Sequence, residues 1–268
     1  MRHLLVSAAV LAYAATGGAA SLPTNPFHFA IFAIDGVELG QSAQVDRGDV
    51  GVNNESGQVM LRARARVAGN IAAGTVVMGR NARANGDLFC TTGPVGTPGC
   101  QALTLPLVDA SLLPVVNVEP GAQDVKLGPR LASTLAAGKY RKVKIGTKSQ
   151  LKLAAGTYTF QSLRIGKGAA LLCQGACTIG VDQPVYIEQS GILSTTDPAD
   201  ASKVRINIEF GSPNRAAFFA TQKSRVDATV YAPVGIIRLG TNGRFSGAFV
   251  AKSVELMQRA RVVVDPQS

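Results

Sequence analysis

A nine-residue pattern that recurs along the chain constrains its fold more than any other feature. The pattern is apolar-x-apolar-Gly-x-x-small-x-apolar, so its apolar and small positions are separated by even numbers of residues. In an extended chain such positions project to one side, whereas a helix would scatter them around its axis. Five copies keep the glycine: VELGQSAQV (37–45), VVMGRNARA (76–84), VKIGTKSQL (143–151), LRIGKGAAL (163–171) and IRLGTNGRF (237–245). Two further copies replace it: VMLRARARV (59–67) and VELMQRARV (254–262).

The spacing of the copies favours a coiled, stacked architecture. Their first residues are separated by 22, 17, 67, 20, 74 and 17 residues, and we interpret the short intervals as single turns and the long ones as several turns. A glycine at the fourth position permits a bend, and a small seventh residue fits an inner corner. Short strands that bend in this way and stack on the preceding turn form a β-solenoid. The sequence therefore predicts an all-β protein with a single-stranded parallel β-helix, since an ordinary β-sandwich would not require this repeated nine-residue spacing.

The repeats also resemble those of known proteins. Segments 59–88 and 237–262 are similar to the repeats of bactofilins, polymer-forming β-helical proteins, in their alternating apolar residues, their Gly-x-x-Ala steps and the glycine that follows. The order of an LAAGxY motif, a Cys-bearing turn, PVYIEQSG (184–191) and segment 229–256 resembles secreted bacterial β-helix surface domains of unknown function. The two resemblances cover most of residues 30–265 and imply a β-helix that polymerises or lies at a bacterial surface.

The N-terminus has the composition of a secretory signal peptide. A short basic stretch precedes apolar residues from Leu4 to Ala15, and small residues then lead to a predicted cleavage site near Ala20. The apolar stretch is too short to span a bilayer, and no later stretch reaches the roughly 18 apolar residues that a spanning helix needs. We therefore expect residues 1–20 to be removed and the protein to be released, either into the periplasm or outside the cell. Such export departs from the usual cytoplasmic bactofilin and argues against a cytoskeletal role.

Four cysteines in an exported chain predict two disulfides. Cys90 and Cys100 flank the loop TTGPVGTPG, and Cys173 and Cys177 close the short sequence CQGAC. We expect these to be two local disulfides that each pin a loop. A metal site is disfavoured because the chain has no Cys-x-x-Cys motif and only one histidine after the signal peptide, and we expect no cofactor.

We expect residues 21–268 to form one β-helix domain. Residues 27–39 begin the strands, and their apolar alternation predicts an N-terminal edge or cap. Two stretches interrupt the repeat. Residues 89–124 contain the Cys90–Cys100 loop and a Leu/Pro-rich passage, which is either a side excursion or a set of irregular coils, and residues 195–202 form a polar loop.

Basic residues recur at the eighth position of the repeat. The chain holds 27 Lys and Arg against 17 Asp and Glu, a formal net charge of +10, which is compatible with a polyanionic partner, an anionic surface or simple solubility. Four of the seven copies carry arginine at the eighth position: Arg66, Arg83, Arg244 and Arg261. The spacing within each pair is 17, which predicts that the two arginines of a pair lie side by side on neighbouring coils. Lys144 and Arg164 extend the basic character through the middle of the chain.

Two interpretations of these basic residues remain open. Like charges about 5 Å apart repel by only about 1 kcal/mol in water, so a solvated basic face needs no ligand. The functional alternative is a stripe that binds an anionic polymer such as an acidic polysaccharide. Nucleic acid is a weaker candidate, because the basic motifs lack aromatic stacking platforms and the predicted compartment is wrong.

The sequence favours a non-catalytic function. Acidic residues are sparse, and no two recur at a spacing that would stack them as paired carboxylates, so no catalytic residue is predicted. Ice binding would require a regular threonine ladder, which Thr157 and Thr159 do not provide. We therefore predict an exported structural or adhesive β-helical protein of the bacterial cell surface, which self-assembles head to tail or contacts an anionic polysaccharide or surface. The alternative is a β-helix that binds a polysaccharide or degrades it as a lyase or hydrolase.

Overall fold

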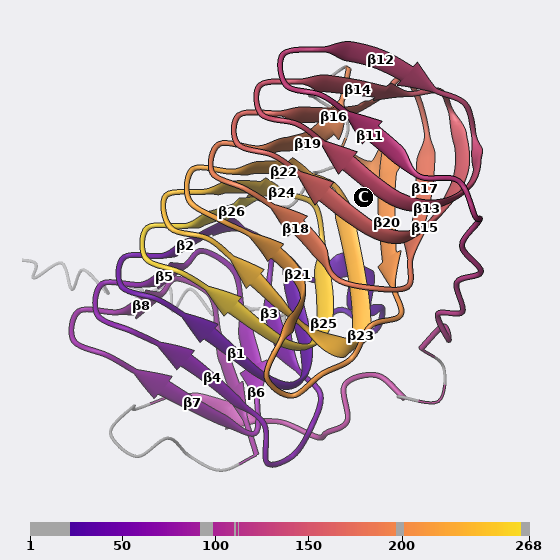
Figure 1. Ribbon diagram of the computed structural model, residues 1–268. Helices are drawn as coiled ribbons and strands as arrows, with labels where there is room; N and C mark the ends of the chain where they lie inside the picture. The colour runs from indigo at the N-terminus through magenta and orange to yellow at the C-terminus, as the bar shows by residue number, and fades with distance from the viewer. Residues whose placement is uncertain (1–21, 92–98, 110, 112, 197–200, 264–268) are drawn as a thin grey trace, which may run out of the picture.

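The strands wind into a column of parallel coils, so the predicted β-solenoid is confirmed (Figure 1). The computed structural model describes residues 22–91, 99–109, 111, 113–196 and 201–263. The predicted signal peptide, residues 1–20, lies outside this range. Short 3-10 helices include η1 (Pro26–His28), before the first strand, and η3 (Ala201–Lys203).

Two sheets form the three faces of the column. A 16-stranded sheet bends around one edge and makes faces A and B, and a 10-stranded sheet makes face C. The main path of the larger sheet is, in spatial order, β10 (Cys100–Ala102), β9 (Leu88–Cys90), β6 (Ile71–Ala73), β3 (Val50–Val52), β1 (Ile31–Leu39), β25 (Phe249–Leu256), β23 (Thr229–Leu239), β20 (Val204–Ile208), β17 (Cys177–Val181), β15 (Gly156–Ile165), β13 (Gly138–Ile145) and β11 (Val125–Leu127).

The long strands β1, β13, β15, β23 and β25 bend, so that their first halves lie on face A and their second halves on face B. Face B also contains β11 and four strands off the main path: β4 (Gln58–Leu61), β7 (Thr75–Met78), β18 (Val185–Ile187) and β21 (Ala216–Ala220). Face C is, in spatial order, β12 (Ala132–Leu135), β14 (Gln150–Leu153), β16 (Ala170–Cys173), β19 (Ile192–Thr195), β22 (Arg225–Asp227), β24 (Arg244–Ser246), β26 (Arg261–Val263), β2 (Gln44–Arg47), β5 (Arg66–Val67) and β8 (Arg83–Ala84).

The nine-residue pattern forms the corner between faces B and C. In the first copy, Val37 and Leu39 are buried at the end of face B, Ala43 is buried in the corner, and Val45 begins the buried row of face C. The sixth residue of each copy has a left-handed backbone, with φ between 55° and 62°. In spatial order these residues are Arg130, Lys148, Gly168, Ser190, Lys223, Asn242, Arg259, Ser42, Arg64 and Asn81.

Three of these corners belong to copies that the sequence pattern does not detect. They are VKLGPRLAS (125–133), VYIEQSGIL (185–193) and FFATQKSRV (218–226), and each has the left-handed sixth residue. The first has Leu131 at the small seventh position, and the other two replace the glycine by Glu188 and Thr221. The copies at 185 and 218 confirm that the long interval from 163 to 237 contains several turns.

At several corners a glycine at the fourth position allows close stacking of the coils. Gly40 donates its N–H to the carbonyl oxygen of Leu256 at 2.6 Å, and a Cβ atom at Gly40 would lie only 2.7 Å from that oxygen. Gly166 meets the carbonyl oxygen of Ile145 in the same way, again at 2.7 Å from an added Cβ. The prediction that this glycine makes the bend was therefore wrong, because the left-handed residue two positions later turns the chain.

We expect Arg259→Gly to stabilise the protein. A non-glycine residue in the left-handed region costs about 1–2 kcal/mol, and glycine loses roughly 0.5–1 kcal/mol more backbone entropy on folding, so the net gain is about 0.5–1 kcal/mol. Urea unfolding followed by circular dichroism measures this change. The matched control is Gln258→Gly at the preceding residue, which lacks a left-handed φ and should lower stability. A loss of stability in both variants would contradict the conclusion that Arg259 has an unfavourable left-handed backbone.

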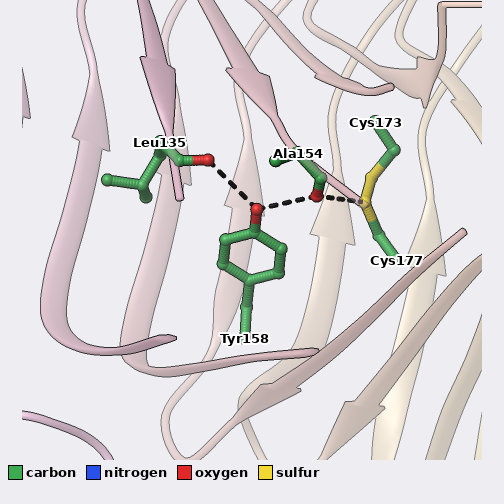
Figure 2. Close-up of a disulfide and its surroundings, with 5 residues drawn as sticks. All are labelled: Leu135, Ala154, Tyr158, Cys173 and Cys177. Carbon is green, nitrogen blue, oxygen red and sulfur yellow. Dashed lines mark hydrogen bonds between the residues drawn. A yellow bond between two sulfur atoms is a disulfide. The ribbon is translucent and has the colours of Figure 1, made fainter. Parts of the chain in front are cut away.

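A tyrosine hydroxyl closes the opposite corner, between faces C and A, in two successive coils. Both coils carry an LAAGxY motif, at 135–140 and 153–158. The hydroxyl of Tyr140 donates to the Ala136 carbonyl at 2.9 Å, and the hydroxyl of Tyr158 donates to the Ala154 carbonyl at 2.8 Å. The Tyr158 oxygen also lies 3.1 Å from the carbonyl oxygen of Leu135 in the neighbouring coil (Figure 2). Burial raises the pKa of the Tyr158 phenol, so this donor stays protonated.

A disulfide takes the place of the tyrosine in the next coil. Cys173 pairs in register with Leu153 and Cys177 with Gly156, so the Cys173–Cys177 bond closes the same corner one coil further along. Figure 2 shows the Cys177 sulfur beside the Ala154 carbonyl oxygen, at 3.7 Å. The second disulfide, Cys90–Cys100, joins β9 to β10, the last strand at one end of the column. Both predicted cysteine pairings are confirmed.

The coils are not stacked in the order of the chain. From β1 the chain winds to β10 at one end of the column, and residues 103–124 then run along the outside to the opposite end (Figure 1). From β11 the chain winds back until β25 pairs with β1. The 67-residue interval between the copies at 76 and 143 therefore contains coils at both ends of the column and the crossing between them, and its interpretation as several turns left the crossing out.

Strand β1 is central and not the predicted edge or cap. It pairs in parallel with β25 on one side and with β3 and β4 on the other. Its residues are apolar on both surfaces because both are covered: Ile31 points into the column, and Phe32 packs outside it with Phe29, Tyr231 and Val250. Apolar residues of 27–39 thus belong to two cores, one inside the column and a second, external one.

Residues 103–109, 111 and 113–124, called the strap below, cover this external core. Val108 packs in it, and the side-chain amide of Asn53 bonds both the N–H and the carbonyl of Val108 at 2.8 Å. The Tyr231 hydroxyl donates to the Pro114 carbonyl at 2.7 Å, and a Glu209 oxygen accepts the N–H of Val118 at 2.7 Å. The predicted irregular stretch 89–124 therefore supplies β9, β10 and the strap. Part of the predicted polar loop 195–202, residues 197–200, lies outside the described residues.

The Tyr231–strap contact should make stability fall at alkaline pH. Burial raises the pKa of Tyr231 to about 12 from an ordinary 10.0, while nearby Arg205 opposes part of the rise. The neutral phenol is thus favoured in the folded state, so its contribution is complete below pH 10 and is lost as pH rises toward 12. We expect Tyr231→Phe to be less stable than the wild type by about 1 kcal/mol at pH 8, with a gap that narrows between pH 10 and 12. Urea unfolding of both proteins across this range measures the difference in their free energies of unfolding. A difference that does not change with pH would contradict the role given to the Tyr231 hydroxyl.

Candidate functional site

Five arginines lie in one row on the outside of face C. Each occupies the eighth position of a corner, which is the first outward residue of a face C strand. The row, called the arginine row below, contains Arg225, Arg244, Arg261, Arg66 and Arg83. All five side chains are exposed. Neighbouring strands of a sheet are about 4.8 Å apart, so the row presents positive charge at five of the six coils from β22 to β8.

The predicted pairs are part of this one row. Arg66 pairs in register with Arg83, and Arg244 with Arg261, as their spacing predicts. Gln44 lies between Arg261 and Arg66 and joins the two pairs, although the pairs come from opposite ends of the sequence. The position of β1 and β2 between the two halves of the column therefore produces one continuous surface.

Sequence analysis missed the fifth arginine, Arg225. It lies in the undetected copy 218–226, where Thr221 stands at the glycine position. The small residue Ser224, buried in the corner, and the apolar Val226 that follows Arg225 are the remaining signals of the pattern. This copy also has an apolar residue, Phe219, at the second position, which obscures the alternation.

Two aspartates neutralise part of the row. Arg225 Nε lies 2.7 Å from Asp227 Oδ2, and Asp227, which is only 5% exposed, also accepts a hydrogen bond from the buried Ser194 hydroxyl at 2.7 Å. Arg261 Nε lies 3.0 Å from Asp46 Oδ2. These groups surround a shallow hollow of about 570 Å³.

The other three arginines of the row have no acidic partner. In the described part of the chain, Arg66, Arg83 and Arg244 form no ion pair. Their guanidinium groups can each present several N–H donors to a carboxylate, sulfate or phosphate group. The row can therefore bind anions at three positions without breaking an existing ion pair.

The two remaining predicted site residues lie on another face. Lys144 and Arg164 are neighbours in register on face B, with Lys126 on the far side of Lys144. Arg164 is bound by Glu188, whose Oε1 lies 2.6 Å from Nη2 and 2.8 Å from Nε. The structure therefore divides the six predicted basic residues into four on face C and two around the corner on face B.

Comparisons with known proteins give a partial family match. A family model described as a domain of unknown function, DUF7305, matches residues 191–268, which include three members of the arginine row. A solved structure, an ice binding protein from an Antarctic Biological Consortium, is similar over 91% of this chain and 92% of its own, with 16% identity and a TM-score of 0.41. No curated protein matches the chain. Within the described residues, no helix is long and apolar enough to cross a membrane.

Replacement of Asp227 and Asp46, one at a time, should show that the buried Asp227 contributes more to the free energy of unfolding than the more exposed Asp46. We expect Asp227→Ala to lower the free energy of unfolding by about 1–3 kcal/mol, because the buried Ser194 hydroxyl loses its acceptor. Asp46→Ala removes a more exposed ion pair and should cost at most about 1 kcal/mol. Urea unfolding of the two variants measures both effects. Equal losses would show that Asp227 is not the structural anchor of this part of the row.

Proposed function

We propose that this protein is a non-catalytic, extracytoplasmic β-solenoid of the bacterial surface that binds a linear anionic polymer along face C. The observation that carries the proposal is the arginine row, in which Arg66, Arg83 and Arg244 are exposed and lack acidic partners among the described residues. Two disulfides support an oxidising compartment, since such bonds are rare in the cytosol.

The geometry of the row suits a polymer better than a small anion. The row follows the solenoid axis over six coils, from Arg225 to Arg83, and Gln44 is its one uncharged position. A rigid sheet fixes the spacing of these side chains, so little backbone entropy is lost when an extended ligand binds. A repeat of about 4.8 Å is close to the length of one sugar unit in a linear glycan, so an acidic polysaccharide can place carboxylates beside successive arginines.

Both ends of the column carry basic residues, which supports a protein that binds its ligand as a monomer. Lys126 and Arg130 lie on the coil at one end, and Arg80 and Arg83 lie near the other. Head-to-tail stacking would bring these like charges together, which opposes association. We therefore favour adhesion to a polymer over self-assembly as the function of the surface.

The test replaces the three unpaired arginines of the row. We expect the purified protein to bind polygalacturonate, with an affinity that falls steeply as NaCl rises from 50 to 300 mM. The triple variant Arg66→Gln, Arg83→Gln, Arg244→Gln should bind about 10- to 100-fold more weakly, because each exposed charge contact contributes up to about 1 kcal/mol. Isothermal titration calorimetry at 50 mM NaCl measures the difference.

A matched control removes the same charge from the other basic surface. The variant Lys126→Gln, Lys142→Gln, Lys148→Gln also lowers the net charge by three, but its residues lie on face B and its corner. This variant should keep most of the affinity. Equal weakening in both variants would mean that net charge alone drives binding and would overturn the assignment to face C.

A further inference from the structure

A second candidate binding surface lies around the corner from the arginine row. A groove of about 620 Å³ runs along the corner side of face B and crosses the coils from β15 to β25. Its floor is formed by fourth-position residues of the corners, among them Thr221, Gly240 and Met257. Because Gly240 has no side chain, the groove is open where larger residues on either side would fill it.

One wall of the groove is aromatic. Tyr186 of β18 and Phe219 of β21 are outward neighbours in register, with ring centroids 5.4 Å apart and an interplanar angle of 72°. Arg164 of β15 lies against the Tyr186 ring, with its guanidinium carbon 5.3 Å from the centroid. These two rings are only partly buried, so the wall offers apolar surface to a ligand in the groove.

The opposite wall consists of amide and hydroxyl groups. Gln189, Gln222 and Thr241 occupy the fifth position of three consecutive corners and line the groove. Among the described residues, their side chains form no hydrogen bond, although their backbone groups are paired between coils. Each coil therefore offers free side-chain donors and acceptors at intervals of about 4.8 Å.

The middle of the groove carries no unpaired charge. The Arg164 guanidinium is bound by Glu188, and the second oxygen of Glu188 accepts the N–H of Lys167 at 3.0 Å. Lys167 is the one cation at the groove without an ion pair in the described part of the chain, and it lies at one end. This chemistry differs from that of the arginine row, where guanidinium groups dominate.

We propose that the groove binds a linear, uncharged oligosaccharide parallel to the solenoid axis. Sugar rings present apolar C–H surface that packs on aromatic side chains, and hydroxyl groups that bond amides and hydroxyls. The aromatic wall and the amide wall supply these two kinds of contact at the same coils. This site is independent of the proposed anionic-polymer surface, because it lies on another face and uses different residues.

The test uses cellohexaose, laminarihexaose and chitohexaose with the full protein. We expect at least one of them to bind in isothermal titration calorimetry, with an affinity that changes less than twofold between 50 and 500 mM NaCl. Phe219→Ala should weaken that binding at least tenfold, and Gln222→Ala about three- to tenfold. The Gln222 side chain is exposed, so this second variant tests the site even if Phe219→Ala folds poorly.

The matched control is Gln41→Ala, which removes the same side chain from the same corner position three coils away, outside the groove. This variant and the triple arginine variant should bind the oligosaccharide as the wild type does. Failure of all three sugars to bind, or unchanged binding in both groove variants, would overturn the proposal. Neither result would affect the salt-dependent binding of polygalacturonate at face C.

Discussion

The parallel pairing of β1 with β25 is the contact on which the rest of the structure depends. It joins a half that winds from β1 toward β10 to a half that winds from β11 back to β25, and seven residue pairs form its register. On face C the same junction places β2 between β26 and β5. The arginine row is continuous only because these strands meet, since its members come from both halves. The continuous charged surface therefore exists only when the junction is formed.

The strap makes this arrangement compatible with a single chain. A chain that begins in the middle of a column must cross from one end to the other, and where the crossing segment packs on the column its backbone groups leave water and need partners. Asn53, Tyr231 and Glu209 supply such partners from face A. The apolar residues of the strap and of the outer surface of face A then cover one another. The crossing segment is therefore a stabilising layer as well as a connection.

Most of the local structure could be predicted from the sequence, because one corner recurs with the same nine-residue spacing. The pattern locates the corner, the buried small residue and the outward arginines, and the cysteine spacing gives both disulfides. The order of the coils could not be predicted, because the coils share one pattern of buried apolar residues and this pattern does not specify which coils are neighbours. The unbroken apolar run 30–34, with Phe32 on the outer side, was a signal that 27–39 is covered on both sides. Arg225 was missed because its copy lacks the glycine and also has the apolar Phe219 where the pattern is usually polar, and the aspartates that pair with the row lie outside the pattern.

The central position of β1 and β26 has a consequence for attachment and growth. The described chain enters and leaves the column at its middle, so both ends of the rod are built from internal segments. A partner attached close to β1 or β26 would contact the middle of the rod and leave both of its ends free. A longer rod would arise by adding coils next to β10 or β11, on either side of the strap, and the strap would have to lengthen with each added coil.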